Sequence, residues 1–209
     1  QQALALAGGA VKYPEAAFYL AGLALADQRF AQALPLLDAA LSGNPKSAAY
    51  LGARAYARLR SGDLPGAVAD ERDAAEVGAI GALIELAALL WRGPASQPEE
   101  ARLAEARRHL DLALAALEAP QLPASDARPW QYELADDQDP LTLETRAEKR
   151  CLAQLLRLST ARLQGEASEF PSPLPAGCGA QAGQMPQAIR VMLDLEVGAP
   201  PSRAAELRQ

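Results

Sequence analysis

Gly62-Asp63-Leu64-Pro65-Gly66-Ala67 decides the fold, because it repeats the pattern of Gln28-Arg29-Phe30-Ala31-Gln32-Ala33 exactly 34 positions earlier in the chain. The same offset joins Ala40 to Ala74 and Leu41 to Ala75. Each copy has the residues of a turn followed by the start of a helix. Small and apolar residues at a period of about 34 are typical of stacked helix–turn–helix units. The sequence therefore predicts an all-α protein built from repeated helix pairs.

The composition favours the same class of fold. Half of the 209 residues are hydrophobic, but only 5% are aromatic, and alanine is abundant. Alanine-rich helices pack closely, and the scarcity of β-branched residues argues against a large sheet. The net charge of −6 is wrong for a duplex-binding surface, so we expect no nucleic-acid partner. No apolar run is long enough to predict a transmembrane segment.

Three units follow a lead-in at residues 1–13, and they span 14–47, 48–81 and 82–118. In the first unit, we expect helices at about 15–27 and 30–42. Gly43 is expected to end the second helix as a left-handed cap, and Asn44-Pro45 to open the next unit as N-cap and first turn. In the third unit, Ser96-Gln97-Pro98-Glu99 fits a capping box.

The repeat pattern stops after Leu117. Residues 119–140 are acidic and contain four prolines, which is typical of a linker. Two further helices are expected at about 141–164, ending at Gly165, and at 186–197, with a cysteine-containing loop between them. Terminal repeats need a cap over their last apolar face. We therefore expect residues 141–209 to cap the array.

These positions resemble tetratricopeptide repeats, and the third unit resembles the related Sel1-like repeats. The resemblance covers about residues 14–118. It is carried by Pro45 and by three sets of equivalent positions: Phe30/Leu64/Leu103, Ala33/Ala67/Ala106 and Ala40/Ala74/Ala113. Two positions depart from it: Glu71 replaces a large apolar residue, and Ala79 replaces the proline present at Pro45. The resemblance implies a superhelical array of helix pairs.

The resemblance also implies a protein or peptide partner on the concave face made by the first helix of each unit. In this register the face includes Glu15, Tyr19, Tyr56 and Arg60, with the small residues Gly22, Ala26, Ala49 and Gly52 around them. Tyrosine offers contact area with a polar tip, and arginine can hold a carboxylate. Ordinary packing is the alternative for each residue. We expect Trp91 to lie in the core.

Catalytic and metal-binding patterns are weak in this chain. His109 is its one histidine, and a partly exposed helical position is the simpler interpretation. Cys151 and Cys178 are its two cysteines, which are too few for a convincing zinc site. A disulfide between them is favoured over two free thiols, and it would require an oxidising compartment. The acidic residues Glu133, Asp136, Asp137 and Asp139 lack the spacing of a calcium loop. We expect no cofactor and no metal.

Three functions remain open at this stage. The favoured one is a non-catalytic scaffold or adaptor in a bacterial cell-envelope assembly, located in the periplasm. The alternative is a cytoplasmic chaperone for a secretion-system substrate, which the acidic composition and the three units fit. The third is an enzyme that uses Cys151 or Cys178 as a nucleophile. The chain opens with Gln1-Gln2, which fits either a mature product after signal removal or a trimmed chain.

Overall fold

The computed structural model describes residues 13–93, 97–119 and 143–166. Within these ranges the chain forms helices and no strands, which confirms the predicted all-α class for this part. The helices are α2 (Pro14–Ala26), α3 (Phe30–Gly43), α4 (Ala48–Arg60), α5 (Leu64–Glu76), α6 (Ile80–Arg92), α7 (Glu99–Glu118) and α9 (Leu143–Leu163). None of the helices in these ranges has the length and apolar character needed to cross a membrane.

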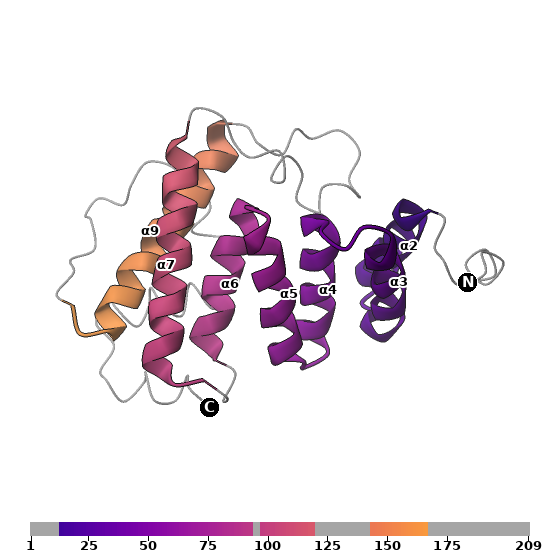
Figure 1. The fold of residues 1–209 in the computed structure, drawn as a ribbon, viewed down its shortest axis with the longest axis horizontal. Coiled ribbons are helices and arrows are strands. Elements are labelled where there is room, and N and C mark those ends of the chain that lie inside the picture. Colours follow the sequence, from indigo (N-terminus) through magenta and orange to yellow (C-terminus); the bar gives the residue numbers. More distant parts are fainter. Residues whose placement is uncertain (1–12, 94–96, 120–142, 167–209) are drawn as a thin grey trace.

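The helices stand side by side in chain order (Figure 1). They form consecutive pairs, α2 with α3, α4 with α5 and α6 with α7, and each pair also packs on the next. Helix α9 lies against α7 and also contacts α6. One hydrophobic cluster runs through the whole row, from Ala17 and Phe18 in α2 to Ala153 and Leu156 in α9.

Alanines at the predicted repeat positions are fully buried between packed helices. Ala33, Ala67 and Ala106 are 0% exposed, as are Ala40, Ala74 and Ala113. In each helix the two alanines are seven residues apart, which is about two turns, so both lie on one side. Because a methyl group occupies little space, neighbouring backbones can approach each other there. The positions that repeat in the sequence are therefore positions of buried contact between helices.

The first two units are joined differently from the prediction. Ser47, not Asn44, is the N-cap of α4, and its Oγ accepts a hydrogen bond from the Tyr50 amide at 3.3 Å. Asn44 instead ends α3, donating its amide to the Ala40 carbonyl at 3.1 Å. Gly43 is not left-handed. Its small size matters because a Cβ there would lie 2.9 Å from the Pro14 side chain.

The third unit begins earlier than expected, because α6 starts at Ile80 and not near residue 82. It lies 32 residues after α4, so Ala79 is equivalent to Ser47 and not to Pro45. Helix α7 starts at Glu99 with Pro98 as N-cap, two residues after the predicted cap Ser96, which lies outside the described residues. Arg102 covers the end of α6 by donating to the Leu90 carbonyl at 2.7 Å.

Helix α9 covers the last repeat pair through polar as well as apolar contacts. Arg146 donates to the Leu117 carbonyl at 2.8 Å, at the end of α7. Trp91 donates its indole N–H to Thr160 Oγ1 at 2.9 Å and packs against the core, as expected. Helix α9 ends at Leu163, and Gly165 has a φ of +83°, as predicted for its stop. The predicted helix at 186–197 and nearly all of the linker lie outside the described residues.

Replacing Ala67 by leucine should lower the free energy of unfolding by about 1–3 kcal/mol, because three extra carbons must fit a fully packed helix interface. Ala69→Leu is the matched control, since Ala69 is exposed on the same helix and the change in helix propensity is the same. Urea unfolding followed by circular dichroism measures both. Equal effects of the two substitutions would show that the interface is not closely packed.

Candidate functional site

The residues predicted to bind a partner lie on α2 and α4. Glu15, Tyr19 and Arg60 are exposed and Tyr56 is half-buried, while Gly22 and Gly52 are buried. We define the A-helix face as the positions predicted to bind a partner, together with their equivalents on the first helix of each pair, wherever the residue keeps solvent access. Its members are Glu15, Tyr19, Ala26, Ala49, Tyr56, Arg60, Gly81, Glu85 and Ala88. Described contacts bring Tyr56 and Arg60 together, whereas Glu15 and Tyr19 lie separately on α2.

Arg60 is held in place by two aromatic rings. Its Nη1 donates to Tyr56 Oη at 3.1 Å. Its guanidinium lies 5.0 Å from the ring centre of Phe30 and 5.7 Å from that of Tyr56, within the range of cation–π attraction. The two rings meet edge to face at 6.0 Å. Phe30 belongs to α3 and was named from the sequence only as a repeat position, so its part in this cluster was missed.

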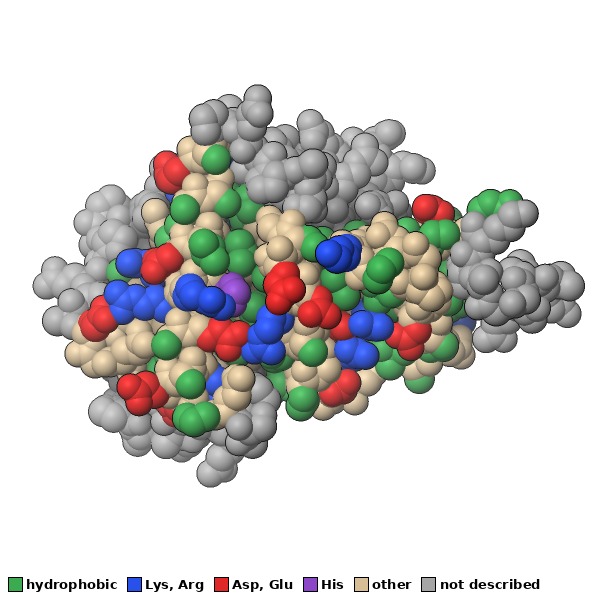
Figure 2. Space-filling model, viewed as in Figure 1, with side chains coloured by type: hydrophobic (Ala, Val, Ile, Leu, Met, Phe, Trp, Pro, Cys, Tyr) green, Lys and Arg blue, Asp and Glu red, His purple; other side chains and the backbone are tan. Residues whose placement is uncertain are grey.

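Other arginines of α4 are occupied by carboxylates. Asp70 is 1% exposed; it accepts a hydrogen bond from Arg54 Nη2 at 2.7 Å and forms an ion pair with Arg58 Nη1 at 2.9 Å. Arg54 also binds Asp38 of α3 at 2.7 Å, so the network joins three helices. Burial raises the pKa of Asp70, although both guanidiniums oppose that shift. Figure 2 shows such acidic and basic side chains next to one another across the middle of the molecule.

Glu71 is the second buried carboxyl of α5. It is 2% exposed and occupies the position held by the fully buried Leu37 and Leu110 in the other units. Burial, and then the nearby charge of Glu85, raises the pKa of Glu71 well above its ordinary value. A hydrogen bond between the Glu71 and Glu85 carboxyls raises the pKa of Glu71 further, because it favours the proton on Glu71. Glu85 keeps solvent access on the A-helix face. The departure of Glu71 from the repeat pattern was noted in the sequence, but its contact with Glu85 was not predicted.

His109 has the surroundings of a core residue. It is buried on α7, with an Nδ1 atom that has no hydrogen-bond partner in the described structure. Burial and then the charge of Arg108 lower its pKa, so its imidazole is neutral. Glu105, which lies 3.8 Å from it, is bound by Arg72 at 2.8 Å. Among the described residues, no group of three or more His, Cys, Asp or Glu side chains could hold a metal ion.

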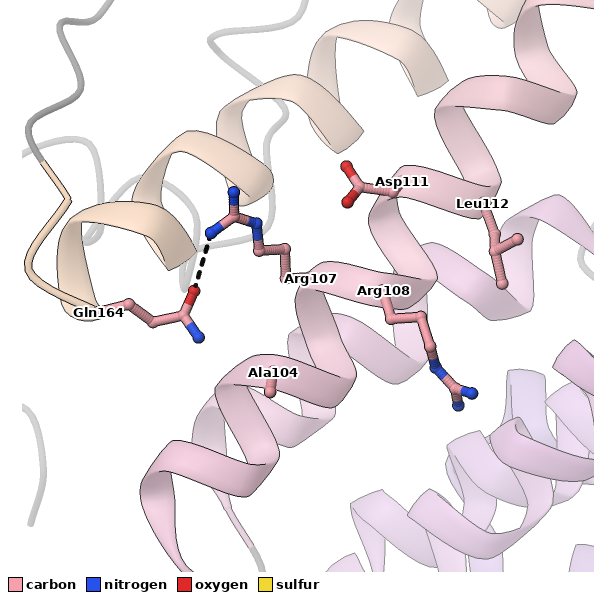
Figure 3. Close-up of a pocket in the computed structure, with 6 residues that line it drawn as sticks. All are labelled: Ala104, Arg107, Arg108, Asp111, Leu112 and Gln164. Atoms are coloured by element: carbon pink, nitrogen blue, oxygen red, sulfur yellow. Dashed lines mark hydrogen bonds between the residues drawn. The ribbon is translucent and has the colours of Figure 1, made fainter.

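A shallow hollow of about 440 Å³ lies between α7 and the end of α9 (Figure 3). It is lined by Ala104, Arg107, Arg108, Asp111, Leu112 and Gln164. Arg107 donates to Gln164 at 3.4 Å and pairs with Glu166, and Asp111 pairs with Arg157. Most of its charges are therefore satisfied within the chain, and the pairs join α7 to α9.

The two cysteines are only partly described. Cys151 is buried on α9. Cys178, the acidic residues Glu133, Asp136, Asp137 and Asp139, and the loop around Cys178 lie outside the described residues. The disulfide between Cys151 and Cys178 stays a prediction, which a count of free thiols under denaturing, non-reducing conditions decides.

Replacing Glu71 by leucine, the residue of the equivalent position Leu37, should stabilise the protein at pH 7 by about 1–3 kcal/mol. Because the pKa of Glu71 is raised on folding, its contribution to stability is greatest below the unfolded value of 4.5. That contribution falls as the pH rises from there through the raised pKa. Melting temperatures of the wild type and the variant between pH 4 and pH 9 measure this pH-dependent contribution of Glu71 to stability.

The control for this prediction is Glu76→Leu, because Glu76 is exposed at the end of the same helix. The wild type and the control should lose stability with rising pH across that window more steeply than Glu71→Leu. Parallel profiles for all three proteins would show that Glu71 is ionised in the folded state.

Comparisons with known proteins leave the function to be argued from the geometry. No family model matches the chain, and the searches of curated proteins and of solved structures find no match either.

Proposed function

We propose that this protein is a non-catalytic interaction module that binds a segment of a partner protein on its A-helix face. The observation that carries the proposal is the exposure of Arg60 and its contacts with aromatic rings. Its guanidinium is exposed and fixed over two aromatic rings, and no carboxylate pairs with it in the described residues. Arg54 and Arg58 on the same helix are both bound to Asp70. An oriented arginine without an anion is suited to an external ligand.

The composition of the A-helix face supports the same proposal. Tyr19 is 56% exposed, so its ring offers contact area with a hydrogen-bonding tip. Tyrosine and arginine are enriched among the residues that dominate binding energy. The half-buried Ala49, Gly81 and Ala88 have small side chains, which leave room for a partner beside the larger ones. The resemblance to tetratricopeptide repeats points to this face as well.

The setting of the proposed module is a cell-envelope assembly, with a cytoplasmic chaperone as the alternative. Both use the same face, and they differ in the compartment and in the partner. A partner recovered from the envelope fraction supports the first setting, and a stable complex with an exported protein supports the second. An enzyme based on a reactive thiol is disfavoured because Cys151 is buried.

The triple variant Tyr19→Ala/Tyr56→Ala/Arg60→Ala should lose at least 90% of a partner that the wild type captures from native extract. All three side chains contribute to one face, and each removal costs about 1–2 kcal/mol of binding free energy. Arg108→Ala/Leu112→Ala is the control, because both residues are exposed on α7 away from this face. Circular dichroism must show unchanged helicity.

A partner that is retained by the triple variant and lost by the α7 control would contradict the proposed surface. It would place binding beside the hollow between α7 and α9.

A further inference from the structure

His109 is buried on α7 with one ring nitrogen unpaired. Its Nδ1 atom has no hydrogen-bond partner among the described residues, and only 6% of the residue is exposed. Its Nε2 atom lies 3.3 Å from Nη2 of Arg108. A guanidinium can only donate, so Nε2 of the neutral ring accepts this hydrogen bond and the ring hydrogen lies on Nδ1. A further proton on His109 therefore goes to Nε2, which then faces Arg108 as a second donor.

One carboxylate oxygen lies next to this ring, and an arginine of another unit already binds it. Oε1 of Glu105 is 3.8 Å from Nε2 of His109. The same oxygen accepts a hydrogen bond from Nε of Arg72 at 2.9 Å and lies 2.8 Å from Nη2 of that arginine. Arg72 belongs to α5 in the second unit, whereas Glu105 belongs to α7 in the third. We call this ion pair the Arg72–Glu105 bridge, because it joins α5 directly to α7.

The charges that act on His109 within the described ranges oppose a proton on it. Burial and then the charge of Arg108 lower the pKa of His109, and Arg72 adds to this shift. Glu105 opposes the shift, but Arg72 already pairs with its carboxylate. A protonated imidazole would therefore be the third cation around a single carboxylate, in a place where water is largely excluded.

Charged side chains on the other helices that pack against α7 are engaged elsewhere. On α9, the carboxylate and arginine groups pair with α7 residues other than His109, and two further arginines bind carbonyl groups at the end of α7. These contacts are Arg157 with Asp111, Glu166 with Arg107, and Arg146 and Arg150 with the Leu117 carbonyl. On α6, Glu85 interacts with Glu71. Glu105 is thus the one described carboxylate that can respond to a charge on His109.

We propose that His109 makes the contact between α5 and α7 acid-sensitive, because a proton on its Nε2 displaces Arg108 and weakens the Arg72–Glu105 bridge. The new N–H turns toward Glu105 Oε1, the oxygen that Arg72 also uses. The second and third units then separate more easily at this point. The proposal does not depend on the proposed function.

The direction of the pH effect follows from the lowered pKa of His109. Its contribution to stability is fully present above the unfolded value of 6.5, and it is lost as the pH falls from there toward the lowered folded value. Glu71 acts in the opposite direction, since its contribution is greatest at low pH. A variant of His109 is therefore needed to separate the two groups.

Hydrogen–deuterium exchange at pH 7.5 and pH 5.5 tests the proposal. His109→Leu carries the residue of the equivalent position Leu36, and His109→Gln is a second variant that stays polar without titrating. Each variant is compared with the wild type at the same pH, so that the intrinsic exchange rates cancel. From pH 7.5 to pH 5.5, exchange of α5 and α7 in the wild type should rise relative to the variants by up to about ten-fold. That limit holds for an imidazole that stays neutral in the closed form and titrates at 6.5 in the open form. Exchange in α2 and α3 should keep the same ratio at both pH values.

A titration of the wild type alone gives a second test. The chain has one histidine, so the imidazole protons give one set of signals in an NMR spectrum. We expect these signals to titrate below pH 6.5. A pKa of 6.5 or above would overturn the proposal, as would the same pH dependence of exchange in the wild type and both variants. Acid-induced exchange that rises equally in all helices would also contradict it, because the effect would not be confined to the contact between α5 and α7.

Discussion

Close approach of helices at six alanines is the constraint on which the rest of the structure depends. The second helix of each pair carries two of them, seven residues apart and 0% exposed in all three units. Because a methyl group occupies little space, the helices of each pair can approach closely there, and the pairs stack in a row (Figure 1). Larger side chains such as Leu37 and Leu110 fill the space between these contacts. The position of every residue on the A-helix face follows from this stacking.

The second unit departs from that apolar pattern, and the departure reaches the candidate site. Asp70 and Glu71 are adjacent on α5 and both are buried. Asp70 pairs with two arginines of α4, and these ion pairs join α4 to α5. Arg60, at the end of α4, instead contacts the aromatic rings of Phe30 and Tyr56. Glu71 contacts another carboxyl, Glu85, and its burial raises its pKa, which favours the protonated form. Burying polar groups in this way costs stability compared with leucine, but it ties the core to groups on the surface.

Much of the fold follows from local sequence, and most of the site does not. The helices and their buried alanines could be predicted because spacing and residue size are local properties. The cap of α4 was assigned to Asn44 because Asn44 and Ser47 are both good N-caps, and the choice depends on where α3 packs. The start of α6 was missed because α5 and the link after it are each one residue shorter than α3 and the link before α4. The contact between Glu71 and Glu85 and the place of Phe30 beneath Arg60 both join separate helices, so no local pattern reveals them.

Site-specific photo-cross-linking distinguishes binding on the A-helix face from binding on the exposed side of α7. A benzoylphenylalanine would replace Glu15 or Ala49 on that face, or Ala104 or Ala115 on α7, all of which keep solvent access or are half-buried. We expect cross-links to one partner from residues 15 and 49 and none from residues 104 and 115. Cross-links from α7 alone, with none from α2 and α4, would contradict binding on the A-helix face.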